Sequence, residues 1–232
     1  MSDFLLIHGS CHGAWCWDDL IPHLQAAGHT ARAIDLPSHG QDKTPPGEVT
    51  LDLYARAIVD AIDTPVVLVG HSMAGYPITA AANLAPEKIS QLIYLCAYVP
   101  MAGKSLADMR RMAPSQPLLD AIEVDADRVT FSVKSAQAAE KFYHDVPRDR
   151  ADWAVSQLCP QPILPQETAM VPAHSLPRHY IRCLDDRTIP PEFQVTMTAE
   201  WPTDTVTEMP TSHSPFLADP AGLAAHLIRI AG

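Results

Sequence analysis

A run of apolar residues that ends in a tight turn and continues as a helix constrains the fold of this chain most strongly. The run Val66–Val69 is followed by the residues Gly-His-Ser-Met-Ala-Gly, so that Ser72 stands at the tip of the turn. Such a sharp turn strains the backbone of its central residue and requires small neighbours, which Gly70, Ala74 and Gly75 provide. The helix that follows directs partial positive charge towards the serine, and this charge favours an oxyanion. The segment therefore predicts that Ser72 is a nucleophile and not an ordinary turn serine.

Short apolar runs alternate with helical patterns along most of the chain. Alternation of this kind is typical of a parallel sheet with helices packed on both of its faces. We predict an α/β fold with about six mostly parallel strands, in which Gly28 ends the first helix. The predicted strands are 4–7, 31–34, 65–69, 89–95, 179–184 and 205–208, and the predicted helices are 17–27, 51–62, 73–84, 191–198 and 220–230.

The alternation stops after Pro100 and resumes near residue 179. The intervening segment ends in a proline-rich stretch, which favours extended or turning chain over regular elements. We therefore predict a core formed by residues 1–100 and 179–232, and a cap formed by the inserted residues 101–178. The cap is expected to contain helices near 105–112, 136–142 and 149–158 and a hairpin over 122–133.

Composition and charge restrict the partners of the chain. It has 232 residues, of which 47% are hydrophobic and 19% charged, as in a globular protein, and its net charge is -11. An acidic surface repels nucleic acid and anionic membrane surfaces, so we expect neither as a partner. The N-terminal residues lack the basic region of a signal peptide, and the five cysteines have no paired spacing, which favours free thiols in a reducing compartment. We predict a cytoplasmic protein that acts on a small molecule.

Two further side chains are needed to activate a serine hydroxyl: an imidazole that accepts its proton and a carboxylate that orients the imidazole. His213 lies in a loop between the last predicted strand and the last helix, whereas the later His226 lies within the helical pattern. The acid should precede the histidine along the chain and follow a strand. Asp185 and Asp186 both satisfy this condition, and we favour Asp186 because a short loop separates it from the proline that opens the next helix.

Two backbone amides are expected to bind the oxyanion. One is the amide of Met73, which follows the nucleophile, and the other is the amide of Ser10 in the loop after the first predicted strand. The same loop contains His8 and His12, whose spacing also occurs in metal sites. Glycines next to both histidines favour a loop over a helix face, and no carboxylate is adjacent, so we expect neither a metal nor another cofactor.

The cap is expected to contribute walls to the substrate pocket, because apolar side chains line most pockets for small ligands. Phe142, Trp153, Leu158 and Met112 are the candidates from the cap. Cys11 is the candidate from the loop after the first strand. The alternative for each cap residue is that it packs the cap against the sheet.

Three segments of the chain, Leu6–Trp15, Gly70–Gly75 and Tyr180–Gln194, form a recognisable set of motifs. This set resembles the plant-type methylesterase and hydroxynitrile lyase branch of the α/β-hydrolases and its small bacterial esterase relatives. The resemblance extends over nearly the whole chain. It implies an α/β-hydrolase fold, independently favours Asp186 as the acid and implies a homodimer. It also implies hydrolysis of small carboxylic esters through a Ser-His-Asp triad and an acyl-enzyme intermediate.

Two positions distinguish the activities within this branch. Hydroxynitrile lyases that look like this chain have a threonine after the histidine of the first strand and a lysine after the catalytic histidine, where it stabilises the departing cyanide. This chain has Gly9 and Ser214 at these positions, which favours ester hydrolysis. The alternatives are a hydroxynitrile lyase and a non-catalytic protein that binds a small ligand on the same fold.

Overall fold

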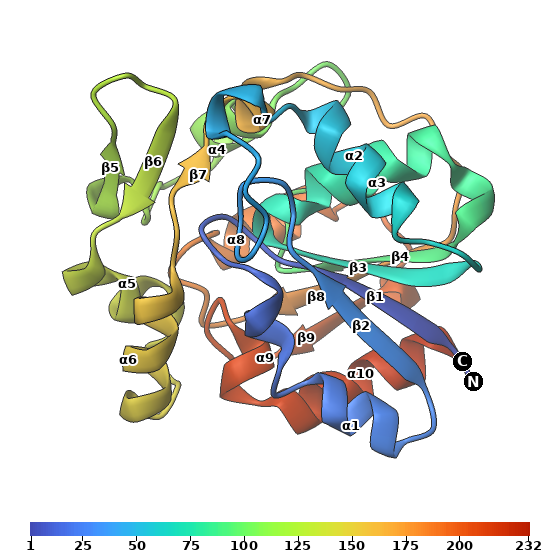
Figure 1. The fold of residues 1–232 in the computed structure, drawn as a ribbon. Helices are drawn as coiled ribbons and strands as arrows, with labels where there is room; N and C mark the ends of the chain where they lie inside the picture. The colour runs from blue at the N-terminus through green and yellow to red at the C-terminus, as the bar shows by residue number, and fades with distance from the viewer.

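A six-stranded parallel sheet forms the centre of the computed structural model, which describes residues 1–232 (Figure 1). The strand order is β2-β1-β3-β4-β8-β9, and every pair of neighbours is parallel. The predicted α/β fold with about six strands is therefore confirmed. The strands are β1 (Asp3–Ile7), β2 (Thr30–Ile34), β3 (Val66–His71), β4 (Ile89–Leu95), β8 (Arg178–Cys183) and β9 (Val206–Met209).

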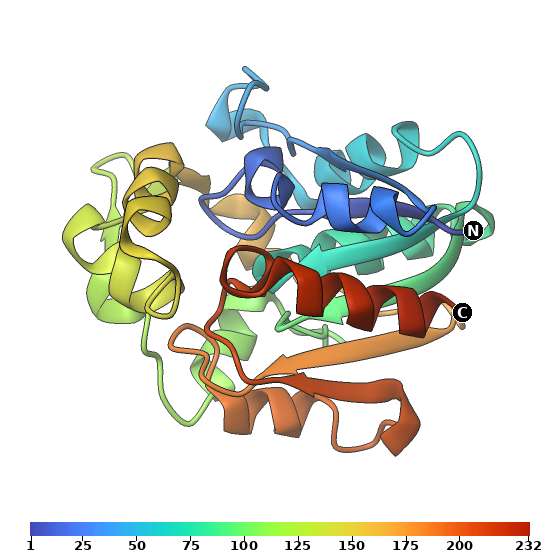
Figure 2. The same cartoon turned by 90° about the horizontal axis from the view of Figure 1, so that it is seen from below.

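Two hydrophobic cores lie on opposite faces of this sheet, with helices over both (Figures 1 and 2). In β3, Val66 and Leu68 belong to one core, and Val67 and Val69 belong to the other. A central strand that is covered on both faces must be apolar on both, which explains its continuous apolar sequence. The helices α2 (Leu51–Asp60), α3 (Gly75–Leu84) and α8 (Pro191–Met197) pack on the first face, and α1 (Ile21–Ala26), α9 (Pro215–Ala218) and α10 (Pro220–Ala231) pack on the second.

The chain between β4 and β8 forms additional elements at the end of the sheet away from the two termini (Figure 1). The predicted hairpin is present as β5 and β6, and a third short strand, β7, pairs with β6. The sequence does not predict β7 because the strand contains Pro162; a proline is tolerated here because β7 lies at the edge of this small sheet. These elements are α4 (Leu106–Met112), β5 (Ile122–Val124), β6 (Thr130–Val133), α5 (Ser135–Phe142), α6 (Arg148–Gln157), β7 (Gln161–Pro162) and α7 (Leu164–Glu167).

The first predicted helix is wrong at its N-terminal end. A 3-10 helix covers Ala14–Trp17, turns follow it, and α1 begins only at Ile21. Pro22 explains the late start, because proline has no N–H group and is accommodated only in the first turn of a helix. A continuous helix over 17–27 would place this proline in its interior. Other 3-10 helices cover Pro46–Glu48, Ser72–Ala74, Pro86–Lys88, Leu119–Ala121 and Thr203–Thr205.

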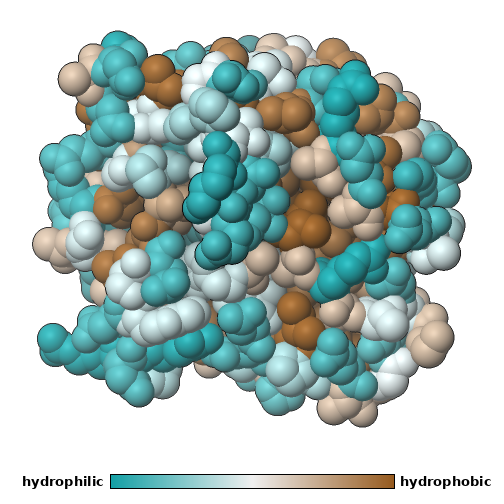
Figure 3. Space-filling view, in the orientation of Figure 1, coloured by the Kyte–Doolittle hydropathy of each residue, from teal (hydrophilic) through white to brown (hydrophobic).

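The surface carries hydrophobic residues in small groups. On the face shown in Figure 3, these groups are separated by hydrophilic residues. Large exposed hydrophobic side chains come from distant parts of the chain and include Leu84, Val171 and Val195. Single apolar residues of this kind are common on globular proteins. No helix is both long enough and apolar enough to cross a membrane.

Gly75 allows α3 to approach the end of β4 closely. A Cβ atom at this position would lie 2.0 Å from the carbonyl oxygen of Tyr98 and 3.3 Å from the Cβ of Ala97. The amide of Tyr98 donates a hydrogen bond to the carbonyl oxygen of Ser72 at 3.0 Å. Because residue 75 has no side chain, α3 can pack directly against the chain segment that also binds the Ser72 turn.

We expect Gly75→Ala to lower the free energy of unfolding by about 1–3 kcal/mol, because the added methyl group must displace backbone atoms. Gly47→Ala is the matched control. Its new Cβ would meet only Cγ1 of Val129, at 3.8 Å, so a change within about 0.5 kcal/mol is expected. Urea unfolding followed by circular dichroism measures both variants. Equal stability of Gly75→Ala and the wild type would contradict the close approach.

Candidate active site

Ser72 lies at the junction of β3 and α3 and has a backbone φ of 56°. This left-handed conformation is uncommon for residues other than glycine and costs free energy. The 3-10 helix Ser72–Ala74 connects the strand to α3. Gly70 is also sterically required, because a Cβ there would lie 2.8 Å from Cδ1 of Ile78 and 3.0 Å from the carbonyl oxygen of Ala74. The turn has both features that its sequence suggests, a strained central residue and small neighbours.

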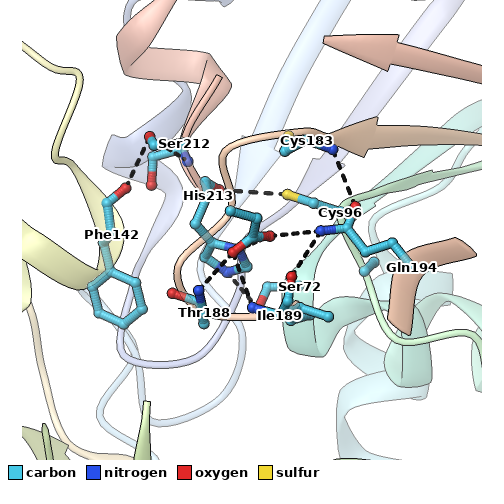
Figure 4. A network of polar contacts seen from close by, with 12 residues as sticks. Ser72, Cys96, Phe142, Cys183, Thr188, Ile189, Gln194, Ser212 and His213 are labelled. Atoms are coloured by element: carbon cyan, nitrogen blue, oxygen red, sulfur yellow. Dashed lines mark hydrogen bonds and ion pairs between the residues drawn. The ribbon is translucent and has the colours of Figure 1, made fainter. Parts of the chain in front are cut away.

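Three side chains from distant parts of the sequence form a hydrogen-bonded chain (Figure 4). Nε2 of His213 lies 2.9 Å from Oγ of Ser72, and Nδ1 of His213 lies 2.7 Å from Oδ2 of Asp186. All three residues are buried, and hydrogen bonds are stronger in such surroundings than in water. The imidazole thus has one nitrogen on the carboxylate and the other on the hydroxyl, which is the geometry that a general base for Ser72 requires.

Four donors surround the carboxylate of Asp186. Its Oδ1 accepts from the backbone amides of Thr188 at 2.7 Å and Ile189 at 2.9 Å. Its Oδ2 accepts from Nε2 of Gln194 at 2.9 Å in addition to the imidazole of His213. Figure 4 shows Thr188, Ile189 and Gln194 converging on this position. These bonds offset the cost of burying the carboxylate and fix its orientation towards the imidazole.

Gln194 is a positioning residue to which the sequence assigns no role. Its Nε2 also donates to the carbonyl oxygen of Ile189 at 2.9 Å, and its Oε1 accepts from the amide of Cys183 at 3.1 Å. The side chain is fully buried and connects α8 to the end of β8. The sequence feature that could have indicated this role is a polar residue in the short helix directly after the Asp186 loop, at a position that faces the core and not the solvent.

Asp185 and His226, the alternatives to Asp186 and His213, lie in other surroundings. Asp185 has an exposed side chain, and its backbone carbonyl accepts from Nε2 of His144 at 2.8 Å. His226 lies on α10, where its Nδ1 bonds to Nη2 of Arg229 at 2.9 Å. The geometry therefore favours Asp186 and His213 for the hydrogen-bonded chain.

The loop after β1 passes close to Ser72. A Cβ at Gly9 would lie 2.8 Å from the Cβ of Ser72, so only glycine fits there. Ser10 lines the same cavity as Ser72, and its Oγ accepts from Nε2 of Gln166 at 2.9 Å. Ser10 and Met73 therefore belong to the two chain segments that adjoin Ser72, as an oxyanion site made from their amides requires.

The protein engages both ring nitrogens of His8 and of His12. In His8, Nδ1 donates to the carbonyl oxygen of the next residue at 2.9 Å, and Nε2 accepts from the amide of Leu36 at 3.1 Å. In His12, Nδ1 donates to the carbonyl oxygen of Ser10 at 2.7 Å, and Nε2 accepts from the hydroxyl of Tyr143 at 2.7 Å. Burial lowers the pKa of both imidazoles, to about 4 in His12. Both are therefore neutral structural groups near pH 7.

Another trio, His71, Cys96 and His213, offers potential metal-ligand atoms within 4.8 Å of one another. Nε2 of His71 already donates to the backbone carbonyl of His213 at 2.8 Å. Burial raises the pKa of the Cys96 thiol well above its ordinary value. Because thiols bind metals as thiolates, this environment favours a protonated, packed cysteine over a metal ligand.

A cavity of about 320 Å³ opens in front of Ser72 and His213, within the size range of small-ligand sites. Its walls combine residues at the end of the sheet with residues of α4, β6 and α7. The predicted pocket residue Phe142, at the end of α5, also lines it. Its further apolar and polar lining includes Tyr98, Leu106, Phe131, Ile163, Arg110 and Gln166.

The other four predicted pocket residues are not part of these walls. Cys11 is fully buried. Trp153 packs edge-on against Trp15 with 5.2 Å between ring centroids, and Leu158 packs against the second core. Met112 is 48% exposed. A role of these four residues in binding substrate stays a prediction, because apolar character alone does not distinguish a side chain that lines a cavity from one that packs the chain.

A serine at a sharp turn after a central strand, with an aspartate and a histidine after two later strands, is the arrangement typical of hydrolases of the α/β type. The sequence matches the profile described as "Alpha/beta hydrolase family" over residues 4–226. The chain belongs to this family.

Similar proteins of known activity are esterases. Methylesterase 4 of Arabidopsis thaliana is 29% identical over 253 residues, which cover 98% of this chain and 95% of the relative. Esterase PIR7B of Oryza sativa subsp. japonica is 30% identical over 254 residues, with 98% and 95% covered. Among solved structures, a pyrethroid hydrolase from Sphingobium faniae JZ-2 has a TM-score of 0.87 at 28% identity, with 99% of this chain and 97% of that chain covered. Polyneuridine aldehyde esterase has a TM-score of 0.86 at 26% identity over 100% of both chains. The predicted resemblance to the plant-type methylesterase branch is confirmed.

We expect the protein to lose stability at acid pH partly through His12. The unfolded chain protonates this imidazole near its ordinary pKa of 6.5, whereas the folded chain does so only near a pKa of about 4. Its contribution is therefore complete above pH 6.5 and is lost as the pH falls from 6.5 towards 4, by up to roughly 3 kcal/mol. His12→Gln removes the titrating group and should make the free energy of unfolding less dependent on pH in this window.

Urea unfolding of the wild type and of His12→Gln at several pH values between 7 and 4 measures this dependence. His23→Gln is the control, because His23 is exposed on α1, and it should leave the wild-type pH dependence unchanged. An equally steep dependence in His12→Gln would show that His12 is not responsible.

Proposed function

We propose that this chain hydrolyses small carboxylic esters by acyl transfer, with Ser72 as nucleophile, His213 as general base and acid, and Asp186 as the group that orients the imidazole. The observation that carries the proposal is the 2.9 Å contact between Nε2 of His213 and Oγ of Ser72. The esterases among the relatives and structural neighbours support this reaction class.

The first half of the reaction transfers the acyl group to the enzyme. Nε2 of His213 takes the hydroxyl proton of Ser72 while Oγ attacks the carbonyl carbon of the ester. The carbonyl oxygen becomes an oxyanion, for which the amides of Ser10 and Met73 are the proposed donors. His213 then gives the proton to the alcohol oxygen, the bond between this oxygen and the carbonyl carbon breaks, and the acyl group remains on Ser72.

The second half removes the acyl group with water. His213 takes a proton from water as the water oxygen attacks the acyl carbon, and it returns a proton to Oγ of Ser72 when the acid leaves. In both halves the imidazole passes through its charged form. Asp186 stabilises this form and holds the tautomer that presents Nε2 to the serine.

Two observations favour ester hydrolysis over cleavage of a hydroxynitrile. The residue after His213 is Ser214, a buried neutral side chain that provides no countercharge for a departing cyanide. A threonine cannot replace Gly9 without a clash, because a Cβ there would lie 2.8 Å from the Cβ of Ser72. An alcohol needs no such countercharge, because His213 protonates it as it leaves.

We further propose that residues 101–178 act as a cap on a core of residues 1–100 and 179–232, since elements from both parts line the cavity. A cytoplasmic location is supported by the five cysteines, all of which are free thiols, as is usual in a reducing compartment. The proposal of a homodimer is based on the family resemblance.

Ser72→Ala is expected to reduce the hydrolysis of p-nitrophenyl acetate by a factor of about 10⁶, to near background. Asp186→Asn is expected to reduce kcat by about 10⁴, because the neutral amide no longer holds the required tautomer of His213. Release of p-nitrophenol by the purified, folded variants measures both effects.

Ser156→Ala is the matched control, because this exposed serine bonds only within the insert, to the carbonyl oxygen of Trp153 at 2.6 Å and to Nε2 of Gln157, and it should retain wild-type turnover. Retained activity of Ser72→Ala would refute the nucleophile. Release of cyanide from mandelonitrile without any hydrolysis of esters would instead identify a lyase.

A further inference from the structure

The cavity in front of Ser72 has a charge balance opposite to that of the whole chain. The protein has 27 acidic and 16 basic side chains. Three arginines, Arg110, Arg111 and Arg128, line this cavity, whereas Glu167 is its only acidic lining residue. Such a local excess of positive charge in an acidic protein attracts an anionic group into the cavity.

Among the three arginines that line the cavity, Arg110 is the one that is partly buried and has no ion-pair partner. It takes part in none of the ion pairs of the structure, whereas its neighbour Arg111 pairs with Asp108 at 3.0 Å. Its side chain makes no hydrogen bond, and its guanidinium carbon lies 5.8 Å from the centre of the Phe131 ring. Burial lowers the pKa of Arg110. A partly buried cation of this kind loses part of its hydration, and a counter-ion that joins it offsets this cost.

Apolar residues on neighbouring elements line the same cavity as this guanidinium. Leu106 lies on α4 with Arg110, Phe131 lies on β6, and Ile163 precedes α7, which packs beside α4 (Figure 1). The cavity therefore offers an apolar space with the hydroxyl of Ser72 and a guanidinium in the same walls. Its occupant should have an apolar body with an ester group and an anionic group.

We propose that the substrate is an ester with a free carboxylate, and that Arg110 binds this carboxylate. The proposal rests on the ester hydrolysis proposed above. A planar guanidinium matches a carboxylate through two parallel hydrogen bonds. A carboxylate also matches the single charge of Arg110.

The experiment compares charged and neutral esters of the same shape. Monomethyl succinate, glutarate, adipate and pimelate carry the carboxylate on the acyl part, and each is paired with a neutral methyl ester in which an isopropyl group replaces the carboxylate. Acetate esters of hydroxy acids carry the carboxylate on the alcohol part. Acid release in a pH-stat gives kcat/KM for each ester. The wild type should prefer the charged member of a pair, most strongly at one chain length that fits the distance between Arg110 and Ser72.

Arg110→Met should lower the ratio of kcat/KM for the charged ester to that for its neutral partner by about 10- to 100-fold, mainly through KM. Arg110→Lys retains the charge but not the planar group and should lower the ratio less. Arg56→Met is the matched control, because Arg56 is an exposed residue of α2 paired with Asp52 at 2.7 Å. It removes the same charge from the protein and should leave the ratio unchanged.

Three results would overturn the proposal. The first is a wild type that prefers the neutral esters at every chain length. The second is full activity of Arg110→Met on both esters, and the third is an equal loss for both esters, which would indicate a purely structural role. Should Arg110→Met fail to fold, the wild-type series and Arg110→Lys still decide the question. Neutral esters that depend on Ser72 without any preference for charge would refute the carboxylate and leave ester hydrolysis intact.

Discussion

The left-handed backbone of Ser72 is the constraint on which the site depends. This conformation, with φ at 56°, costs free energy, and the surrounding packing maintains it. The amide of Tyr98 donates to the carbonyl oxygen of Ser72, and the absence of a side chain at Gly75 lets α3 pack directly against the Tyr98 backbone. The strain therefore resides in an element that two hydrophobic cores hold in place, and the hydroxyl is presented at the sheet edge before any substrate arrives.

The other two groups are positioned by the same edge. Ser72 follows β3, Asp186 follows β8 and His213 follows β9, and in the parallel order β3-β4-β8-β9 all of these strands end at the same edge of the sheet. Loops that follow parallel strands of one sheet meet at one edge. His213 therefore contacts Ser72, 141 positions away along the chain, and Asp186, 27 positions away. Gln194 then connects the carboxylate to the backbone of β8. A small shift of the imidazole would break both of its hydrogen bonds, so this rigid support contributes directly to the chemistry.

The core of the fold follows from the sequence because its determinants are local. The apolar run of β3 and the small residues of the Ser72 turn specify their own structure, and chain order together with the predicted strands indicates His213 and the pair Asp185 and Asp186. Pro22 is also a local signal, because its missing N–H group restricts it to the first turn of a helix, and for this reason the helix predicted over 17–27 is wrong. By contrast, Gln194 and the cavity walls depend on which face of an element meets the site. Trp153 and Phe142 are both apolar residues of the insert, and only their packing decides that Phe142 lines the cavity and Trp153 does not.

The groups proposed for the reaction and the residues that determine its specificity also come from different parts of the chain. The proposed reacting groups follow strands of the sheet, whereas many residues of the cavity walls come from α4, β6 and α7 of the insert. A net charge of -11 would by itself disfavour an anionic ester, but exposed charges are largely screened beyond about 10 Å in 0.1 M salt. An unpaired guanidinium within the cavity acts over a much shorter distance and in apolar surroundings, where its attraction is stronger. On the proposed role of Arg110, local charge and not net charge therefore determines which esters this cavity accepts.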